Sequence, residues 1–235
     1  FGEAVSIQNV LKCLFDLYNS QQAYSVENDS SFYHLFKRIT AEETRFLSLE
    51  ASDYIVVRQF IRQLAALKSQ LAGKKQLERL QGVISRIQPD EYFAGLIEQT
   101  FEEDGTIKDS ATPTLRQIRS KIREVKRKVQ NILQSTFNRS NADKFIQENI
   151  VVLRHGRYTI PCKTNFAQYI DGIIHDRSAS GQTVYVEPTS CVPLNNDLQD
   201  SIIAESEEIA KILAGLLSYF TGSLPALKET VDAYS

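Results

Sequence analysis

Residues 113–133 read PTLRQIRSKIREVKRKVQNIL, and this stretch decides the fold. Its apolar residues recur at alternating steps of three and four, which places them on one face of a helix. These residues are Leu115, Ile118, Ile122, Val125, Val129 and Ile132. A helix of about 30 residues would be about 45 Å long. Since one amphipathic helix cannot bury its stripe alone, the sequence predicts a second long helix packed against it.

A second amphipathic segment, from Leu194 to Phe220, supplies the expected partner, and Gly222 and Pro225 are expected to end it. Its apolar stripe comprises Leu198, Ile202, Ile209, Ile212, Leu213, Leu216 and Phe220. Between the two helices the pattern changes to short β-branched runs, typical of strands. A hairpin is expected over 150–162 and further strands over 170–175 and 183–187. This order predicts an antiparallel helical arm with a small sheet at its tip.

The first hundred residues show helical periodicity in five stretches, at 5–18, from 32, at 54–71, 77–87 and 90–101. The predicted fold class is therefore mainly α with a small antiparallel β insert: a helical core plus long antiparallel lever helices carrying a four-stranded clamp. The expected boundaries are 1–111 for the helical core, 112–148 for the first lever helix, 149–190 for the β clamp and 191–235 for the return lever helix.

Composition sets limits on function. The 235 residues have a net charge of −2, so any basic surface must be local. Three cysteines stand far apart without a CxxC pair, which argues against a disulfide framework. No apolar run approaches the ~20 residues of a membrane span and no signal peptide opens the chain, so we expect a cytoplasmic protein without a membrane partner. The chain begins at Phe1 and lacks methionine, which suggests a segment of a longer protein.

The first lever helix is strongly basic, with eight positive charges and one negative charge between residues 116 and 139. The positive residues are Arg116, Arg119, Lys121, Arg123, Lys126, Arg127, Lys128 and Arg139. Such a helix can face nucleic-acid phosphates, with Arg123, Lys126 and Arg127 as candidate contacts. Alternatively, its charges form a solvated face or pair with acids of the return helix. Counting antiparallel from the sheet places those acids opposite residues 131–142, which predicts incomplete pairing.

A second basic cluster is expected at the clamp tip. If the strands alternate out and back, the turn near Gly156 and the loop 176–182 share the far end, and 163–169 lies at the near end. Five residues would then converge at the tip: Arg154, His155, Arg157, His175 and Arg177. Arginine forks and a glycine-containing loop suit phosphate oxygens, and Lys163 is a further candidate contact. Nothing suggests base-edge reading, so binding should follow shape and charge.

Base stacking, hydrolysis and metal binding are less favoured functions for the clamp. We expect Tyr158 and Phe166 to pack the small sheet rather than stack on bases, with Tyr169 nearby. His175-Asp176 with Ser178 lacks the GxSxG elbow of a hydrolase. Two histidines without further ligands do not make a metal site. The sequence therefore predicts no catalytic residue, cofactor or metal in this chain.

The clamp motifs resemble a known family. Arg154–Lys163, Gly172–Asp176, Ser178–Gly181, Thr183–Pro188 and Leu194–Asn196 are similar to the core of the second bacterial MutS branch, the recombination-suppressor type that ends in a small Smr nuclease domain. The upstream segment Asp104–Ala111, followed by Leu115-Arg116, is also similar. The resemblance covers about residues 101–215, roughly half of the chain.

The resemblance implies a helical core with levers that carry a clamp, in a protein that forms a homodimer through a C-terminal ATPase module. Members of this branch are associated with branched DNA in recombination and with collided ribosomes. This chain has no GxxxxGK[ST] motif, so ATP and Mg²⁺ are expected only in that other module. The expected function is a non-catalytic region that grips branched DNA or ribosomal RNA by backbone contacts. The alternative is a helical scaffold or dimerisation module that binds protein partners such as ribosomal proteins.

Overall fold

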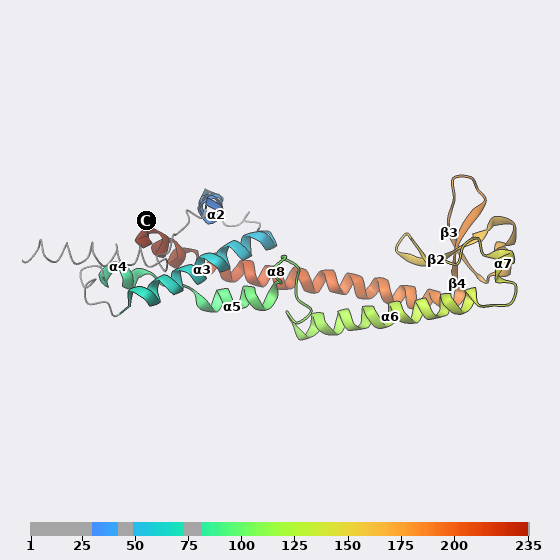
Figure 1. Cartoon of the computed structure of the whole chain (residues 1–235), viewed down its shortest axis with the longest axis horizontal. Helices are drawn as coiled ribbons and strands as arrows, with labels where there is room; N and C mark the ends of the chain where they lie inside the picture. The colour runs from blue at the N-terminus through green and yellow to red at the C-terminus, as the bar shows by residue number, and fades with distance from the viewer. Residues whose placement is uncertain (1–29, 42–48, 73–80, 235) are drawn as a thin grey trace, which may run out of the picture. The chain divides into compact units, whose positions relative to one another are not determined.

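A computed structural model describes residues 30–41, 49–72 and 81–234 of the chain (Figure 1). The described residues are mostly helical, with one four-stranded antiparallel sheet and a long C-terminal helix, which confirms the predicted fold class. The predicted helix 5–18 and the start of the one expected at 77–87 lie outside the described residues. The chain divides into two compact units, residues 1–111 with 211–235 and residues 112–210. Helix α8 (Val192–Tyr234) contributes to both.

The first unit is a helical core. It contains α2 (Ser30–Ala41), α3 (Ala51–Leu71), α4 (Gln81–Arg86), α5 (Glu91–Thr100) and the last part of α8. Asp90 caps α5 by accepting a hydrogen bond from the Phe93 N–H at 2.9 Å. Large side chains fill the interior, including the fully buried Tyr54, Phe93, Phe101 and Phe220.

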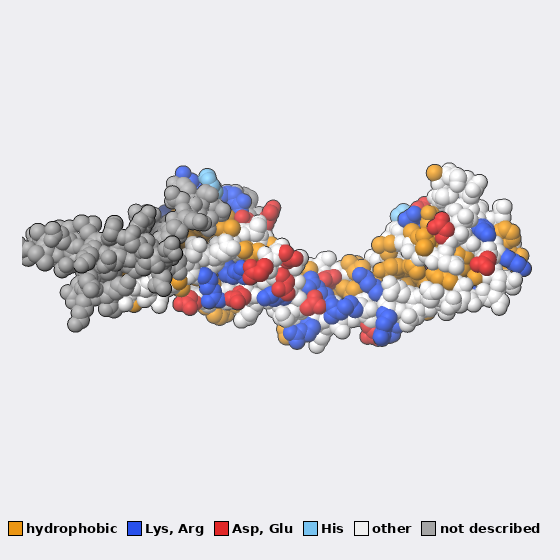
Figure 2. Space-filling view, in the orientation of Figure 1, with side chains coloured by type: hydrophobic (Ala, Val, Ile, Leu, Met, Phe, Trp, Pro, Cys, Tyr) orange, Lys and Arg blue, Asp and Glu red, His pale blue; other side chains and the backbone are white. Residues whose placement is uncertain are grey.

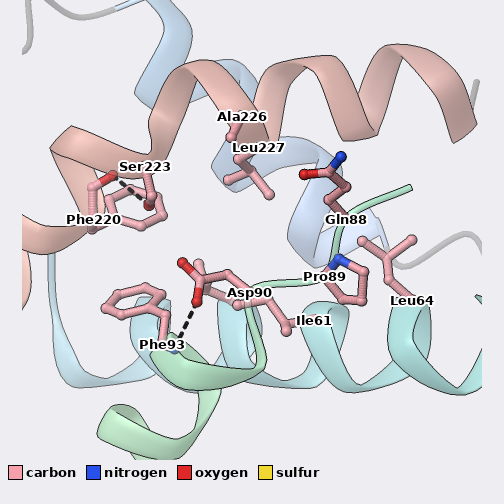
Figure 3. A pocket seen from close by; sticks show the side chains of 11 residues that line it. Ile61, Leu64, Gln88, Pro89, Asp90, Phe93, Phe220, Ser223, Ala226 and Leu227 are labelled. Atoms are coloured by element: carbon pink, nitrogen blue, oxygen red, sulfur yellow. Dashed lines mark hydrogen bonds between the residues drawn. The ribbon is translucent and has the colours of Figure 1, made fainter. Parts of the chain in front are cut away.

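A small cavity lies within this unit between α3, α5 and α8, lined mainly by apolar side chains (Figure 3). Its volume of about 30 Å³ leaves room for a water molecule or two rather than a substrate. At its edge, the Tyr219 hydroxyl donates to Asp90 at 3.0 Å. Burial and this carboxylate raise the pKa of Tyr219. The cavity is therefore a packing feature of the helical core.

Helix α8 differs from its predicted end. Gly222 and Pro225 do not terminate it, and Pro225 lies inside a helix that reaches Tyr234. By length and composition alone, the segment Thr189–Thr230 could cross a membrane, with a mean hydropathy of 1.2 in its most apolar window. Leu216 and Phe220 of this segment are buried in the first unit, where they share a core with α3 and α5. Only 11% of the most apolar window of this segment is buried, so these two residues account for a small part of its surface.

The second unit is built on α6 (Pro113–Phe137). Thr112 caps this helix by accepting from the Leu115 N–H at 3.0 Å. The predicted seam is buried at Leu115, Ile122, Val125 and Val129, with Ile118 partly buried. It then continues through the fully buried Leu133 instead of Ile132, because a step of four from Val129 keeps the stripe on one face of a straight α-helix.

Helix α6 runs antiparallel to the first part of α8 (Figure 1), but the predicted register was wrong. The Arg119 Nε lies 2.7 Å from Glu205, and the Lys121 Nζ lies 3.8 Å from Asp197. Glu208 likewise accepts a hydrogen bond from the Thr112 hydroxyl at 2.8 Å, so these acids face residues 112–121 rather than 131–142. The predicted register assumed that the first lever helix continues up to the sheet. In the structure, α6 ends at Phe137, and its last turns share a hydrophobic core with the sheet.

The sheet consists of β1 (Val152–Arg154), β2 (Arg157–Lys163), β3 (Gly172–Arg177) and β4 (Thr183–Pro188) in the order β1-β2-β4-β3. The short helices η3 (Thr164–Tyr169), between β2 and β3, and η4 (Thr189–Cys191), before α8, complete the clamp, which we define in the structure as residues 149–191. Its core joins the sheet to α6 and to α7 (Ala142–Phe145). The buried residues include Val129, Leu133, Phe145, Ile160, Cys162, Val184 and Val186.

Gly172 is a position where a side chain has no room. A Cβ added there would lie 2.4 Å from the Glu187 carbonyl oxygen of β4, a backbone atom. We predict that Gly172→Ala lowers the free energy of unfolding of the second unit by about 1–3 kcal/mol or more, measured by urea denaturation. Gly215→Ala in α8, where a Cβ meets nothing within 4 Å, should instead be neutral or stabilise by about 0.5–1 kcal/mol. Equal stability of Gly172→Ala and the wild type would contradict the sheet packing.

Two clamp cysteines are fully buried, and burial raises the pKa of Cys162 to about 12 and that of Cys191 to about 11. Since the thiolate is the reactive form, neither should react readily near pH 8 in the folded chain. We predict that a Cys13→Ser variant shows almost no native reaction with a thiol reagent and full reaction in guanidinium chloride. Rapid native labelling would show that the clamp core is open.

Candidate nucleic-acid interface

The clamp is organised around the carboxylate of Glu187, which is 1% exposed. The His175 Nε2 lies 2.5 Å from its Oε2, and Asn195 donates to its Oε1 at 2.7 Å. The Arg157 guanidinium lies 3.4 Å from Oε1. A buried carboxylate is costly unless it is paired and hydrogen-bonded. These contacts therefore tie β2, β3, β4 and α8 together at one point, which we call the Glu187 network.

Asn195 extends this network to the backbone. It accepts from the Tyr158 N–H and donates to the Tyr158 carbonyl, both at 3.2 Å. One turn further along α8, Gln199 donates to the Gly156 carbonyl at 2.6 Å. Gly156 has a φ of 76°, and a Cβ there would lie 2.9 Å from the Gln199 Nε2. The β1–β2 turn is thus fastened to the start of α8.

The β1–β2 hairpin lies across the rest of the sheet. Arg154 of β1 forms an ion pair with Asp176 of β3 at 3.3 Å, and its guanidinium lies over the Tyr185 ring of β4 at 4.1 Å. A β-bulge falls at His175, between the paired residues Ile174 and Asp176. Arg154, Arg157 and His175 are therefore brought close together, but each one faces a carboxylate.

The predicted common tip was wrong. The turn at Gly156 lies at the α8 end of the sheet, whereas the loop between β3 and β4 lies at the opposite end (Figure 1). There the Thr164 N–H donates to the Gln182 carbonyl at 3.0 Å, and Lys163 pairs with Thr183. The reason is topological. Because β4 lies between β2 and β3, these two strands run in the same direction, and η3 forms the crossover between them.

We call the opposite end the outer end of the clamp: Lys163, Arg177 and the loop 178–182. The exposed Arg177 guanidinium makes no hydrogen bond or ion pair with any residue that the structure describes. The Lys163 ammonium donates to the neutral Asp143 carbonyl at 2.7 Å, and it forms no ion pair within the part of the chain that the structure describes. At the other end, the exposed His155 has a φ of 48° within the turn and likewise contacts no described carboxylate.

The basic helix α6 is partly neutralised. Arg119 and Lys121 pair with acids of α8, and Lys128 pairs with Glu124 at 2.6 Å, where its hydrogen bond lowers the pKa of Glu124. Lys126 and Arg127 form no ion pair within the described ranges of the chain, whereas Arg123 has an interaction partner. Figure 2 shows the Lys and Arg side chains gathered over the first part of this helix.

Sequence reasoning missed the Glu187 network. A glutamate that follows Val184 and Val186 in an apolar strand was a usable signal for it. The expectation that Phe166 packs the sheet was wrong, since Phe166 is 39% exposed. Within the described residues, no group of three or more His, Cys, Asp and Glu side chains could hold a metal ion.

No family model matches the chain. Curated relatives do match it in part. The chain is 39% identical over 137 residues to the Endonuclease MutS2 of Symbiobacterium thermophilum, covering 58% of this chain and 17% of that protein. It is 35% identical over 159 residues to the Endonuclease MutS2 of Aquifex aeolicus, covering 68% and 21%. The figures for the Brevibacillus brevis protein of the same name are 33% over 172 residues, 73% and 22%.

The chain therefore spans about a fifth of the length of the curated relatives it matches. The resemblance to the second bacterial MutS branch is confirmed, and the relationship is that of a segment to a longer protein.

Asn195 offers a direct test of the Glu187 network. We predict that Asn195→Ala lowers the free energy of unfolding of the second unit by about 2–4 kcal/mol, because it strips partners from Tyr158 and from a buried carboxylate. Asn196→Ala, at the exposed neighbouring position of the same helix, should stay within about 0.5 kcal/mol of the wild type. Chemical denaturation followed by circular dichroism measures both, and similar small losses in the two variants would refute the network.

Proposed function

We propose that this chain, which matches one segment of the MutS2 proteins, is a non-catalytic region that grips the backbone of nucleic acid. The observation that supports this proposal is the division of the basic residues into two groups. One group faces carboxylates inside the second unit, as Arg154, Arg157, Arg119 and Lys121 do. The other group keeps its charge toward solvent, and it provides the contact surface.

The contact surface has two parts. At the outer end of the clamp, Lys163 and Arg177 lie on strands that flank the start of β4, about 10 Å apart across two strand spacings. The loop between them contains Gly181 with a φ of 70°, and its small residues let backbone N–H groups approach a phosphate. On α6, Lys126 and Arg127 add charge, and neither forms an ion pair with a residue that the structure describes. Such contacts neutralise phosphates without reading bases.

The proposal extends to the whole protein by family relationship. The relatives are named endonucleases, and this chain matches only a fifth of their length. We propose that hydrolysis of ATP with Mg²⁺ and strand cleavage belong to other segments, that the full-length protein is a cytoplasmic homodimer, and that the target is branched DNA or ribosomal RNA. The role of this region is to hold the target while other segments act on it.

A protein-binding scaffold is the second candidate function. Several large apolar side chains of the second unit are exposed, and Figure 2 shows hydrophobic side chains gathered over the start of α8 and the adjoining sheet. The exposed residues are Ile150, Leu153, Ile173, Ile174, Ile202 and Ile203. Large exposed apolar patches mark interaction surfaces. Chemical crosslinking discriminates the two functions: tight self-association without affinity for nucleic acid favours the scaffold.

Nucleic-acid binding should depend on the basic residues of the contact surface and not on those that face carboxylates. We predict that Arg177→Gln and the double substitution Lys126→Gln with Arg127→Gln weaken binding to branched DNA and to structured RNA. Each lost phosphate contact should reduce the slope of log K against log salt concentration by about one. Fluorescence anisotropy across a salt series measures affinity and slope together.

Lys121→Gln is the control, because it removes one positive charge from the same helix at a residue that already faces Asp197. It should leave the slope nearly unchanged. If Lys121→Gln reduces affinity as much as Lys126→Gln with Arg127→Gln, net charge rather than the proposed surface governs binding.

A further inference from the structure

We infer that Phe166 and Tyr169 on η3 form a stacking platform for unpaired bases of the bound nucleic acid. This inference rests on the proposed function and adds a substrate class to it: a strand with unpaired nucleotides at a junction, gap or loop. In this inference, two aromatic side chains stack on bases, which contacts to phosphates do not do.

The platform follows from the geometry of η3. In a 3₁₀-helix, side chains three residues apart lie above one another. On the inner side, Ala167 of η3 packs against the clamp core, and Ile170, the residue that follows η3, is buried at 5% exposure. Phe166 and Tyr169 form the outer column. Their rings are stacked, with centroids 6.1 Å apart and planes inclined by 29°.

The exposure of this pair has no packing explanation. Phe166 is 39% and Tyr169 is 62% exposed. Ala167 and Ile170 already fill the contact between η3 and the clamp core, and the Tyr169 hydroxyl makes no hydrogen bond with any described residue. Aromatic side chains left in water in this way suit a π-face partner, and every base offers one.

The surrounding charge selects nucleic acid as that partner. Lys163 precedes Phe166 by three residues, at the N-terminal end of η3, and its ammonium donates only to a neutral carbonyl among the described residues. Lys144, on the α7 helix that packs against η3, is exposed and forms no ion pair with any described residue. Cations beside stacked aromatic rings are the combination that single-stranded nucleic acid requires. The outer end of the clamp begins at the same lysine, so a strand held there can lay a base on Phe166 and Tyr169.

The test uses the full chain and two DNA probes, a blunt duplex and the same duplex with a single-stranded tail that contains 2-aminopurine. We expect the tailed probe to bind about 5- to 100-fold more tightly, with quenching of the 2-aminopurine fluorescence by stacking. Phe166→Ala with Tyr169→Ala should abolish the preference and the quenching, while binding of the blunt duplex stays unchanged. Phe166→Tyr with Tyr169→Phe, which keeps both rings, should behave as the wild type.

Tyr92→Ala is the matched control, since Tyr92 is an exposed aromatic residue of the first unit, and it should change neither readout. Preference and quenching that persist in the double alanine variant overturn the inference but leave the proposed function intact. A folded chain that binds neither of these probes, and also neither branched DNA nor structured RNA, overturns the proposed function, and the inference with it. If the double alanine variant changes the mass measured by light scattering but not the preference for the tailed probe, the platform binds a second copy and the inference fails.

Discussion

The buried carboxylate of Glu187 is the constraint on which the clamp depends. A charge that is 1% exposed must be neutralised and hydrogen-bonded, and its partners come from three other elements: His175 of β3, Arg157 of β2 and Asn195 of α8. Because these partners belong to different elements, the contacts of one side chain join β2, β3 and β4 to the start of α8. Removing any one partner would leave the buried Glu187 carboxylate short of a hydrogen bond or an opposite charge, which is destabilising. The network therefore holds the clamp and the start of α8 together.

This constraint also decides which basic residues are available to a ligand. Arg157 of the hairpin pairs with Glu187, and Arg154 pairs with Asp176 and lies over the Tyr185 ring. Uncompensated charge is left at the outer end of the clamp, where Lys163 and Arg177 flank a small-residue loop. The division resembles that in many binding proteins, where paired charges set structure and unpaired ones meet the ligand.

Much of the fold was accessible from the sequence because it depends on local patterns. The stripe of α6 and the strand segments follow from helical and alternating periodicity, and the departure at Leu133 reflects the drift of a straight helix against a heptad. The site was less accessible because it depends on topology. Alternating strands would bring Gly156 and Gly181 together, but the crossover through η3 separates them. The pairing of Glu187 with Asn195 joins a strand to a helix, and no periodicity encodes it.

The central claim is that nucleic acid meets the outer end of the clamp rather than the hairpin turn. Site-specific photocrosslinking tests this most directly, with a photoreactive amino acid placed at the exposed Ala179 in one variant and at the exposed His155 in another. The account predicts crosslinks to labelled branched DNA or structured RNA from position 179 and almost none from position 155. Efficient crosslinking from position 155 with none from position 179 would contradict it.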